Sequence, residues 1–202
     1  MKYLIAFSLI LGLTIVSCKN PGQQTAQTSQ DSIPPNDTTN AFFPVADYLE
    51  TEILHVDSVP LALKKYTTIN NRTDSAFIQV PEFNTLAKQF LPQELHDGRF
   101  EKDFTESSFR DNSTQSITFT YSTAAAELPL KRVDVQTIPH NGSQKVRSIY
   151  LEKNYSSGDS LIIQKMYWRA GKSFQIATRT TLKGKPPVEQ LLKVVWDEEE
   201  DE

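Results

Sequence analysis

The chain has 202 residues, and its 25 acidic residues outnumber its 21 basic ones, which gives a formal net charge of −4. This charge argues against nucleic acid as a partner, because phosphate binding needs a basic surface. After the N-terminal segments described next, roughly 157 residues remain between Ala41 and Asp197, which is the size of one domain.

Residues 1–17 are predicted to form an export signal. Lys2 supplies the positive charge, and Tyr3–Val16 is an apolar stretch too short to cross a bilayer, which takes about 20 apolar residues. Cys18, the only cysteine, follows directly. The string Ile15-Val16-Ser17-Cys18 resembles the lipobox of bacterial lipoproteins, here of the Bacteroides type. The resemblance implies that the chain is cut before Cys18 and that Cys18 is acylated.

Acylation of this kind would anchor the protein at a membrane. Two or more acyl chains hold a protein stably, whereas one chain binds only weakly. A lipoprotein signal for retention in the inner membrane resembles one with Asp directly after the cysteine, whereas this chain has Lys19. The resemblance to bacterial lipoproteins therefore implies the outer membrane. The lack of an acidic run after Cys18 favours the periplasmic side over the cell surface. The alternative is a secreted protein with one unpaired thiol.

Residues 18–40 predict a flexible, disordered linker that carries the lipidated cysteine. Gln, Thr, Ser, Asn and Pro dominate it, and so few apolar residues cannot offset the entropy of ordering. Asp31-Ser32-Ile33 and Asp37-Thr38-Thr39 resemble the O-glycosylation sequon of Bacteroides-type bacteria, which implies glycans on Ser32 and Thr38. The alternative is that these Asp-Ser and Asp-Thr pairs form turns.

The domain, residues 41–197, begins with two predicted helices that flank a strand pair. The first helix starts at Pro44, and the second spans Pro81–Leu91 before Pro92 ends it. Apolar residues recur on one face of each helix, so we expect both faces to point into the core. Between the helices, Leu61–Ile69 and Ser75–Val80 predict two paired strands.

The second half predicts an antiparallel meander, in which Asn141-Gly142 signals a tight hairpin and a parity slip between Leu130 and Val133 signals a bulge. Its six strands are Ile117–Tyr121, Leu128–Ile138, Val146–Tyr155, Leu161–Arg169, Phe174–Thr181 and Leu191–Trp196. The predicted fold class is therefore α+β, with about six meander strands and an N-terminal strand pair packed against two helices. The acidic segment 198–202 follows as a solvated tail.

Residues suited to catalysis are scattered through the sequence. The histidines lack a second histidine at metal-ligand spacing, so neither a metal nor a cofactor is expected. Two carboxylate pairs, Glu101 with Asp103 and Glu106 with Asp111, supply the residue types of a glycosidase, provided that the fold brings the members together. The residues concerned are His55, His96, His140, Glu101, Asp103, Glu106 and Asp111.

Tyr167 and Trp168 are adjacent on a predicted strand, so their side chains point to opposite faces of the sheet. One of them must leave the core, and we treat both as candidates for an exposed aromatic contact that stacks on a sugar or lines an apolar groove. The alternative is that a neighbouring layer of polar side chains covers the ring.

Three functions stay open at this point. The leading one is a lipid-anchored, non-enzymatic binding or assembly module at the outer membrane, with a protein or an apolar small molecule as its ligand. The second is a carrier, because helices on a curved antiparallel sheet resemble the layout of periplasmic lipoprotein carriers and of cystatin-like and nuclear-transport-factor-like domains. A carrier requires an apolar cavity of some hundreds of Å³. The third is a hydrolase acting on glycan.

Overall fold

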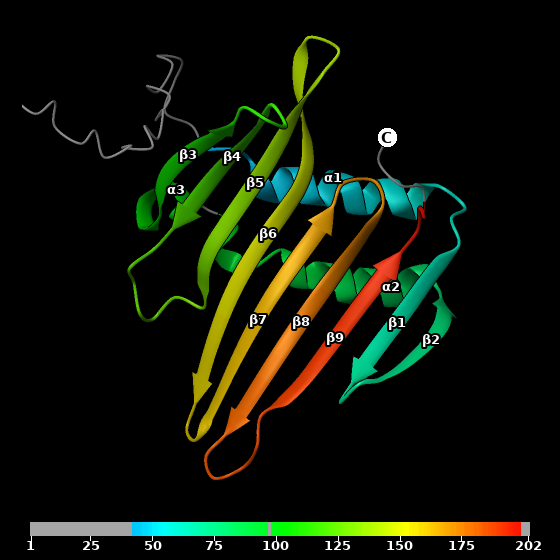
Figure 1. Cartoon of the computed structure of the whole chain (residues 1–202), viewed down its shortest axis with the longest axis vertical. Helices are drawn as coiled ribbons and strands as arrows, with labels where there is room; N and C mark the ends of the chain where they lie inside the picture. The colour runs from blue at the N-terminus through cyan, green and yellow to red at the C-terminus, as the bar shows by residue number, and fades with distance from the viewer. Residues whose placement is uncertain (1–41, 97, 199–202) are drawn as a thin grey trace, which may run out of the picture. The chain divides into compact units, whose positions relative to one another are not determined.

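The computed structural model describes residues 42–96 and 98–198, and Figure 1 shows one sheet with helices on one side of it. The longer helices are α1 and α2, and α3 and two short 3-10 helices, η1 and η2, follow them. In chain order the elements are α1 (Val45–Ser58), β1 (Leu63–Ile69), β2 (Arg72–Ile78), α2 (Val80–Ala87), η1 (Lys88–Phe90), η2 (Gln93–Leu95), α3 (Arg99–Asp103), β3 (Thr105–Asp111), β4 (Ser116–Ser122), β5 (Leu130–His140), β6 (Ser143–Ser157), β7 (Ser160–Arg169), β8 (Ser173–Leu182) and β9 (Val188–Val195).

The described strands form a nine-stranded sheet in the order β2-β1-β9-β8-β7-β6-β5-β4-β3. Each strand from β3 to β9 pairs antiparallel with the next, which confirms the meander. The N-terminal pair joins the same sheet, because β1 pairs antiparallel with β9 and sets Lys64 opposite Val195. This pairing covers the backbone edge of β9, which would otherwise be open to other chains.

The expected number of strands was wrong by one, because Thr105–Asp111 is the edge strand β3. Its only large apolar residue is Phe109, and most of its side chains are exposed, so it lacks the apolar alternation that identifies a strand. Short, polar strands are typical of sheet edges. The five-residue helix α3, which buries Phe100, was also not predicted.

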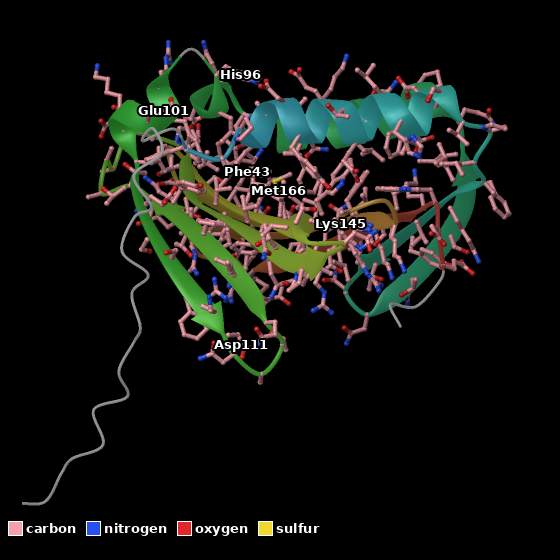
Figure 2. The ribbon with its side chains drawn as sticks, turned by 90° about the horizontal axis from the view of Figure 1, so that it is seen from above. Phe43, His96, Glu101, Asp111, Lys145 and Met166 are labelled. Atoms are coloured by element: carbon pink, nitrogen blue, oxygen red, sulfur yellow. The ribbon has the colours of Figure 1, made fainter. Side chains whose placement is uncertain are left out.

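The helices α1 and α2 cover one face of the sheet, which we call the inner face (Figure 1). On α1, the buried residues Val45, Leu49, Ile53 and Val56 recur at helical spacing, as predicted. Figure 2 looks along the layer between helix and sheet, where Met166 is fully buried. The apolar stripes therefore do point into the core.

Aromatic rings fill the layer between the helices and the middle strands. Trp168 stacks on Phe174 with ring centroids 5.4 Å apart, and Phe90 meets Trp168 edge-on at 5.2 Å. Phe83 and Trp196 form another edge contact at 5.5 Å. Each such pair adds about 0.5–1.5 kcal/mol beyond the burial of its area. The rings occupy the space that an apolar ligand of a carrier would need.

The predicted hairpin and bulge are both present. Asn141 and Gly142 have φ angles of 48° and 77°, which is the left-handed geometry that a two-residue turn requires. The pairing of β5 with β6 shifts between Leu130 and Arg132, as predicted, and shifts again between Gln136 and Thr137.

No helix within residues 42–96 and 98–198 is both long and apolar enough to span a bilayer. The predicted export signal, Cys18 and the linker with Ser32 and Thr38 lie outside the described residues, as does most of the acidic segment.

Candidate functional site on the open sheet face

The sheet face opposite the helices, here called the open face, is turned toward the viewer in Figure 1. No described helix lies on it. The strand register aligns one residue from each of seven neighbouring strands across this face. This tyrosine row consists of Thr120, Asp134, Tyr150, Tyr167, Gln175, Lys193 and Tyr66. At about 4.8 Å per strand, the row spans about 29 Å.

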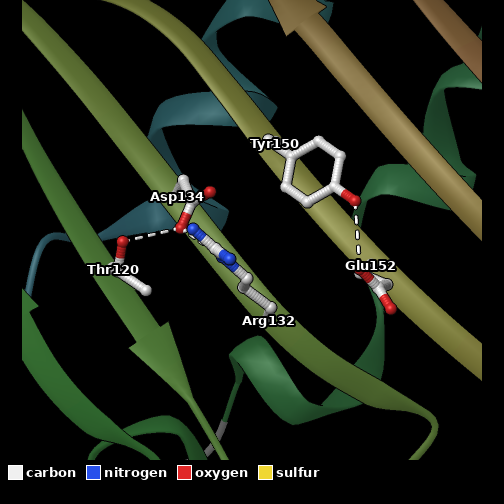
Figure 3. A network of polar contacts seen from close by, with 5 residues as sticks. All are labelled: Thr120, Arg132, Asp134, Tyr150 and Glu152. Carbon is white, nitrogen blue, oxygen red and sulfur yellow. Dashed lines mark hydrogen bonds and ion pairs between the residues drawn. The ribbon is translucent and has the colours of Figure 1, made fainter.

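Tyr150 and Tyr167 lie directly opposite each other on β6 and β7, at the centre of the row. Opposed residues of this kind have Cβ atoms about 5 Å apart, so the two rings are neighbours. The Tyr150 hydroxyl donates a hydrogen bond to Glu152 Oε2 at 3.1 Å (Figure 3). Burial, reinforced by Glu152, raises the pKa of Tyr150 to about 12, so its phenol keeps its proton at neutral pH.

Asp134, the neighbour of Tyr150 in the row, is held by two donors. Arg132 Nε and Thr120 Oγ1 each lie 2.8 Å from Asp134 Oδ1 (Figure 3). Asp134 raises the pKa of the Arg132 guanidinium, which is half exposed, at 50% of its side-chain area. The guanidinium has five N–H donors, and the single bond through Nε leaves the others able to reach a ligand.

A shallow hollow of about 810 Å³ lies on the open face beside the row. Its lining is mixed, with Lys165, Arg179 and Glu189 next to Ile163, Ala177 and Leu191. Another hollow of about 800 Å³ lies along β1 and β2, lined mainly by polar side chains such as Lys65, Thr67 and Asp74. Both hollows are open to solvent, so neither resembles the enclosed apolar cavity that a carrier requires.

The two predicted aromatic contacts lie on opposite faces. Tyr167 is half-buried on the open face, in the tyrosine row. Trp168 is fully buried, so the prediction that it is an exposed contact was wrong. Trp168 shares its parity on β7 with the buried Met166, which faces the helices. Its indole Nε1 donates to Glu52 Oε2 on α1 at 3.2 Å.

The carboxylates considered for a glycosidase lie on two elements, with Glu101 and Asp103 on the helix α3 and Glu106 and Asp111 on the strand β3. Glu106 and Asp111 lie near opposite ends of β3, about 17 Å apart at 3.3 Å per residue. Figure 2 shows Glu101 and Asp111 at opposite ends of this part of the sheet. Asp111 Oδ1 accepts from the Ser113 backbone N at 2.8 Å and from Ser113 Oγ at 2.7 Å. Ser113 therefore lowers the pKa of Asp111, which acts as a turn-forming residue.

The histidines are dispersed as well. His55 lies in the last turn of α1, His96 precedes α3, and His140 lies beside the β5–β6 turn. No group of three His, Cys, Asp or Glu residues suited to hold a metal occurs in the described part of the chain.

A buried lysine was not predicted from the sequence. Lys153 is 4% exposed on the inner face of β6, and its Nζ donates to the Gln89 backbone oxygen at 2.8 Å. Burial lowers the pKa of Lys153, and the nearby Glu94 acts in the opposite sense. Glu94 itself accepts from the Leu130 backbone N at 3.0 Å. These contacts tie η1 and η2 to the sheet, which is a structural role.

The polar residues of the site were also not predicted from the sequence. Arg132, Asp134 and Gln136 alternate with Val133 and Val135, and this pattern identifies a polar face of β5. The alternation could have singled out Asp134, but its position beside Tyr150 depends on the register between strands.

No family model, no curated protein and no solved structure matches this chain. Its function therefore has to be inferred from the chemistry of the open face.

Proposed function

We propose that this chain is a lipid-anchored, non-enzymatic binding module of the bacterial outer membrane that binds a glycan along the tyrosine row. The observation that carries the proposal is the pair Tyr150–Tyr167 at the centre of a sheet face that none of the described helices covers, beside the fixed carboxylates of Asp134 and Glu152. The module would join the membrane to a polysaccharide of the envelope.

The chemistry of the row suits a sugar chain. An aromatic ring offers an apolar surface to the C–H face of a sugar, and its phenol adds a polar edge. Carboxylate, guanidinium and amide groups donate to and accept from hydroxyls, and Asp134, Arg132 and Gln175 supply all three kinds. Because Asp134 and Glu152 are already held by neighbours, little side-chain entropy remains to be lost on binding.

The same surface suits a protein or an apolar ligand less well. The core of a protein interface is depleted of charged residues, whereas the centre of the open face carries Arg132, Asp134 and Glu152. An apolar ligand needs an enclosed apolar pocket, and aromatic side chains fill the layer beneath the helices. A hydrolase needs converging acid and base groups, and Glu106 and Asp111 do not converge.

The anchor is tested at Cys18. Cells that express the full chain are fed a labelled fatty acid, and the purified protein is examined for the label and for its membrane fraction. We expect Cys18→Ser to lose the label and to leave the membrane fraction, because no acyl chain can then be attached. An unlabelled wild-type chain would contradict lipidation.

Glycan binding is tested by co-sedimentation of the full chain, purified in detergent, with insoluble peptidoglycan sacculi. We expect the double variant Tyr150→Ala/Tyr167→Ala to bind about tenfold more weakly, which corresponds to 1.4 kcal/mol from two lost ring contacts. Tyr155→Ala is the control, because Tyr155 lies on the inner face of β6 and its ring also reaches solvent, at 37% exposure.

Circular dichroism of each variant establishes that the sheet is intact. Retention of the wild-type chain by sacculi, with loss confined to the double variant, supports the proposal. Absence of wild-type binding, or equal binding by the double variant, would sink it.

A further inference from the structure

The strand β3 ends the sheet on one side, and no described strand pairs with its outer edge. All seven of its residues pair with β4 in unbroken register. The backbone N–H and C=O groups that point away from β4 are therefore placed to pair with a further strand. Edge strands are often protected from such pairing by proline, lysine or a bulge, and Thr105–Asp111 contains none of these.

The charges of β3 are complementary to themselves when two copies of the strand pair antiparallel. With Ser108 opposite Ser108 of the second copy, each Glu106 lies opposite an Arg110. Both side chains are exposed, and their spacing of four residues puts them on the same face. Glu106 also contacts the Tyr121 hydroxyl on β4, but a carboxylate has a second oxygen that accepts from a guanidinium. Two-fold symmetry forms this pair twice, at about 0.2–1 kcal/mol each.

The exposed ring of Phe109 fits the same arrangement on the open face. Phe109 lies opposite Thr118 of β4, and 54% of its area is exposed. In the antiparallel pair it lies opposite Ser107 of the second copy and diagonal to the second Phe109. Diagonal neighbours are about 7–8 Å apart, a distance that aromatic side chains can bridge. Pairing would therefore cover both rings.

The edge strand at the other side of the sheet, β2, lacks this complementarity. When all seven of its residues pair with a second copy, Ser75 lies at the centre. Arg72 then faces Ile78, and Asp74 faces Ala76. Each charge meets an apolar side chain, so the observations favour β3 over β2 as the contact between copies.

We propose that β3 joins two copies of this chain into a dimer with two-fold symmetry about Ser108. The sheet continues from one copy into the other, and a two-fold contact closes on itself, so it forms dimers and not filaments. The open faces of both copies lie on the same side, which lets one glycan chain contact two tyrosine rows. That last consequence rests on the proposed function, whereas the dimer itself does not.

The test is disulfide cross-linking of the full chain in detergent, with Ser108→Cys as the reporter. Directly opposed residues of antiparallel strands have Cα atoms about 4.5–5.5 Å apart, which a disulfide can span. After mild oxidation, mass spectrometry should find the two introduced thiols linked to each other. Ser75→Cys, at the centre of β2, is the matched control and is the more exposed of the two positions. We expect it to link about tenfold less, because only a specific contact gives a high effective concentration.

Charge reversal in the Ser108→Cys chain tests the register. Arg110→Glu sets carboxylates opposite each other and should lower the yield to that of the control, whereas Glu106→Arg/Arg110→Glu exchanges the charges and should restore it. Circular dichroism of each variant establishes that the sheet is intact. Equal linking of Ser108→Cys and Ser75→Cys, no link at Ser108→Cys, or no recovery in the charge-exchanged variant would overturn the proposal. No glycan takes part, so the outcome is independent of the test with sacculi.

Discussion

Glu52 joins α1 to the β7–β8 hairpin, and its removal should destabilise the domain measurably. Glu52 Oε2 accepts from Trp168 Nε1 at 3.2 Å and from the Gly171 backbone N at 2.7 Å. A hydrogen bond to a charged group contributes about 1.5–3 kcal/mol, and a buried donor left without a partner costs about 1–3 kcal/mol. Water can reach the exposed Gly171, so the second bond is partly replaced. We therefore expect Glu52→Ala to lower the free energy of unfolding by about 2–4 kcal/mol.

Urea denaturation followed by tryptophan fluorescence measures this loss, with the slope m unchanged. A loss of about 3 kcal/mol corresponds to a melting temperature lower by about 6–12 °C in a domain of this size. Glu52→Gln keeps an oxygen acceptor and should lose only about 1 kcal/mol. Glu50→Ala, at an exposed position of the same helix, is the control and should change stability by less than about 0.5 kcal/mol. If Glu52→Ala changes stability no more than Glu50→Ala, the proposed link between helix and hairpin is refuted.

Three further predictions concern stability. Lys153→Met should leave the free energy of unfolding within about 1 kcal/mol of wild type, because an apolar chain of similar volume avoids the cost of a buried charge. Lys153→Ala should lose about 2 kcal/mol or more from the cavity, and urea denaturation that finds the two variants equal would contradict this. Burial raises the pKa of Tyr121, so the unfolded chain releases that proton near pH 10 before the folded chain does. Stability should accordingly fall as the pH rises above about 10. Tyr121→Phe should make this fall less steep in urea midpoints measured from pH 8 to 11, although Tyr150, whose pKa is also raised, still contributes to it; an unchanged slope would contradict the assignment. Gly142→Ala should cost about 1 kcal/mol, because Gly142 has a φ angle of 77°, and a neutral result in thermal denaturation would contradict that strain.

Local patterns were sufficient to predict much of the fold. The helical spacing of Val45, Leu49, Ile53 and Val56 identified α1 and its buried face. The Asn141-Gly142 pair identified the β5–β6 hairpin, because few residues accept two successive positive φ angles. These features depend on neighbours in sequence, where chain geometry alone limits the possibilities.

Features that depend on distant contacts could not be predicted in the same way. The pairing of β1 with β9 joins the two ends of the domain, and nothing local to either strand specifies it. The parity of Tyr167 and Trp168 put them on opposite faces, but the side covered by helices decides which one is buried. The tyrosine row depends on the register between all seven of its strands, which no single strand specifies. Asp134 was therefore not predicted as a site residue, although the alternation of polar and apolar residues along β5 is visible in the sequence.

The most direct test of glycan binding on the open face is an NMR titration of the isotope-labelled full chain in detergent micelles with soluble peptidoglycan fragments. We predict that amide shifts will change chiefly in β6, β7 and β8 around Tyr150, Tyr167 and Gln175, and that residues of α1 will be unaffected. Shifts confined to the helices or the inner face, or no shifts at saturating fragment, would contradict the assignment of the open face as the binding surface.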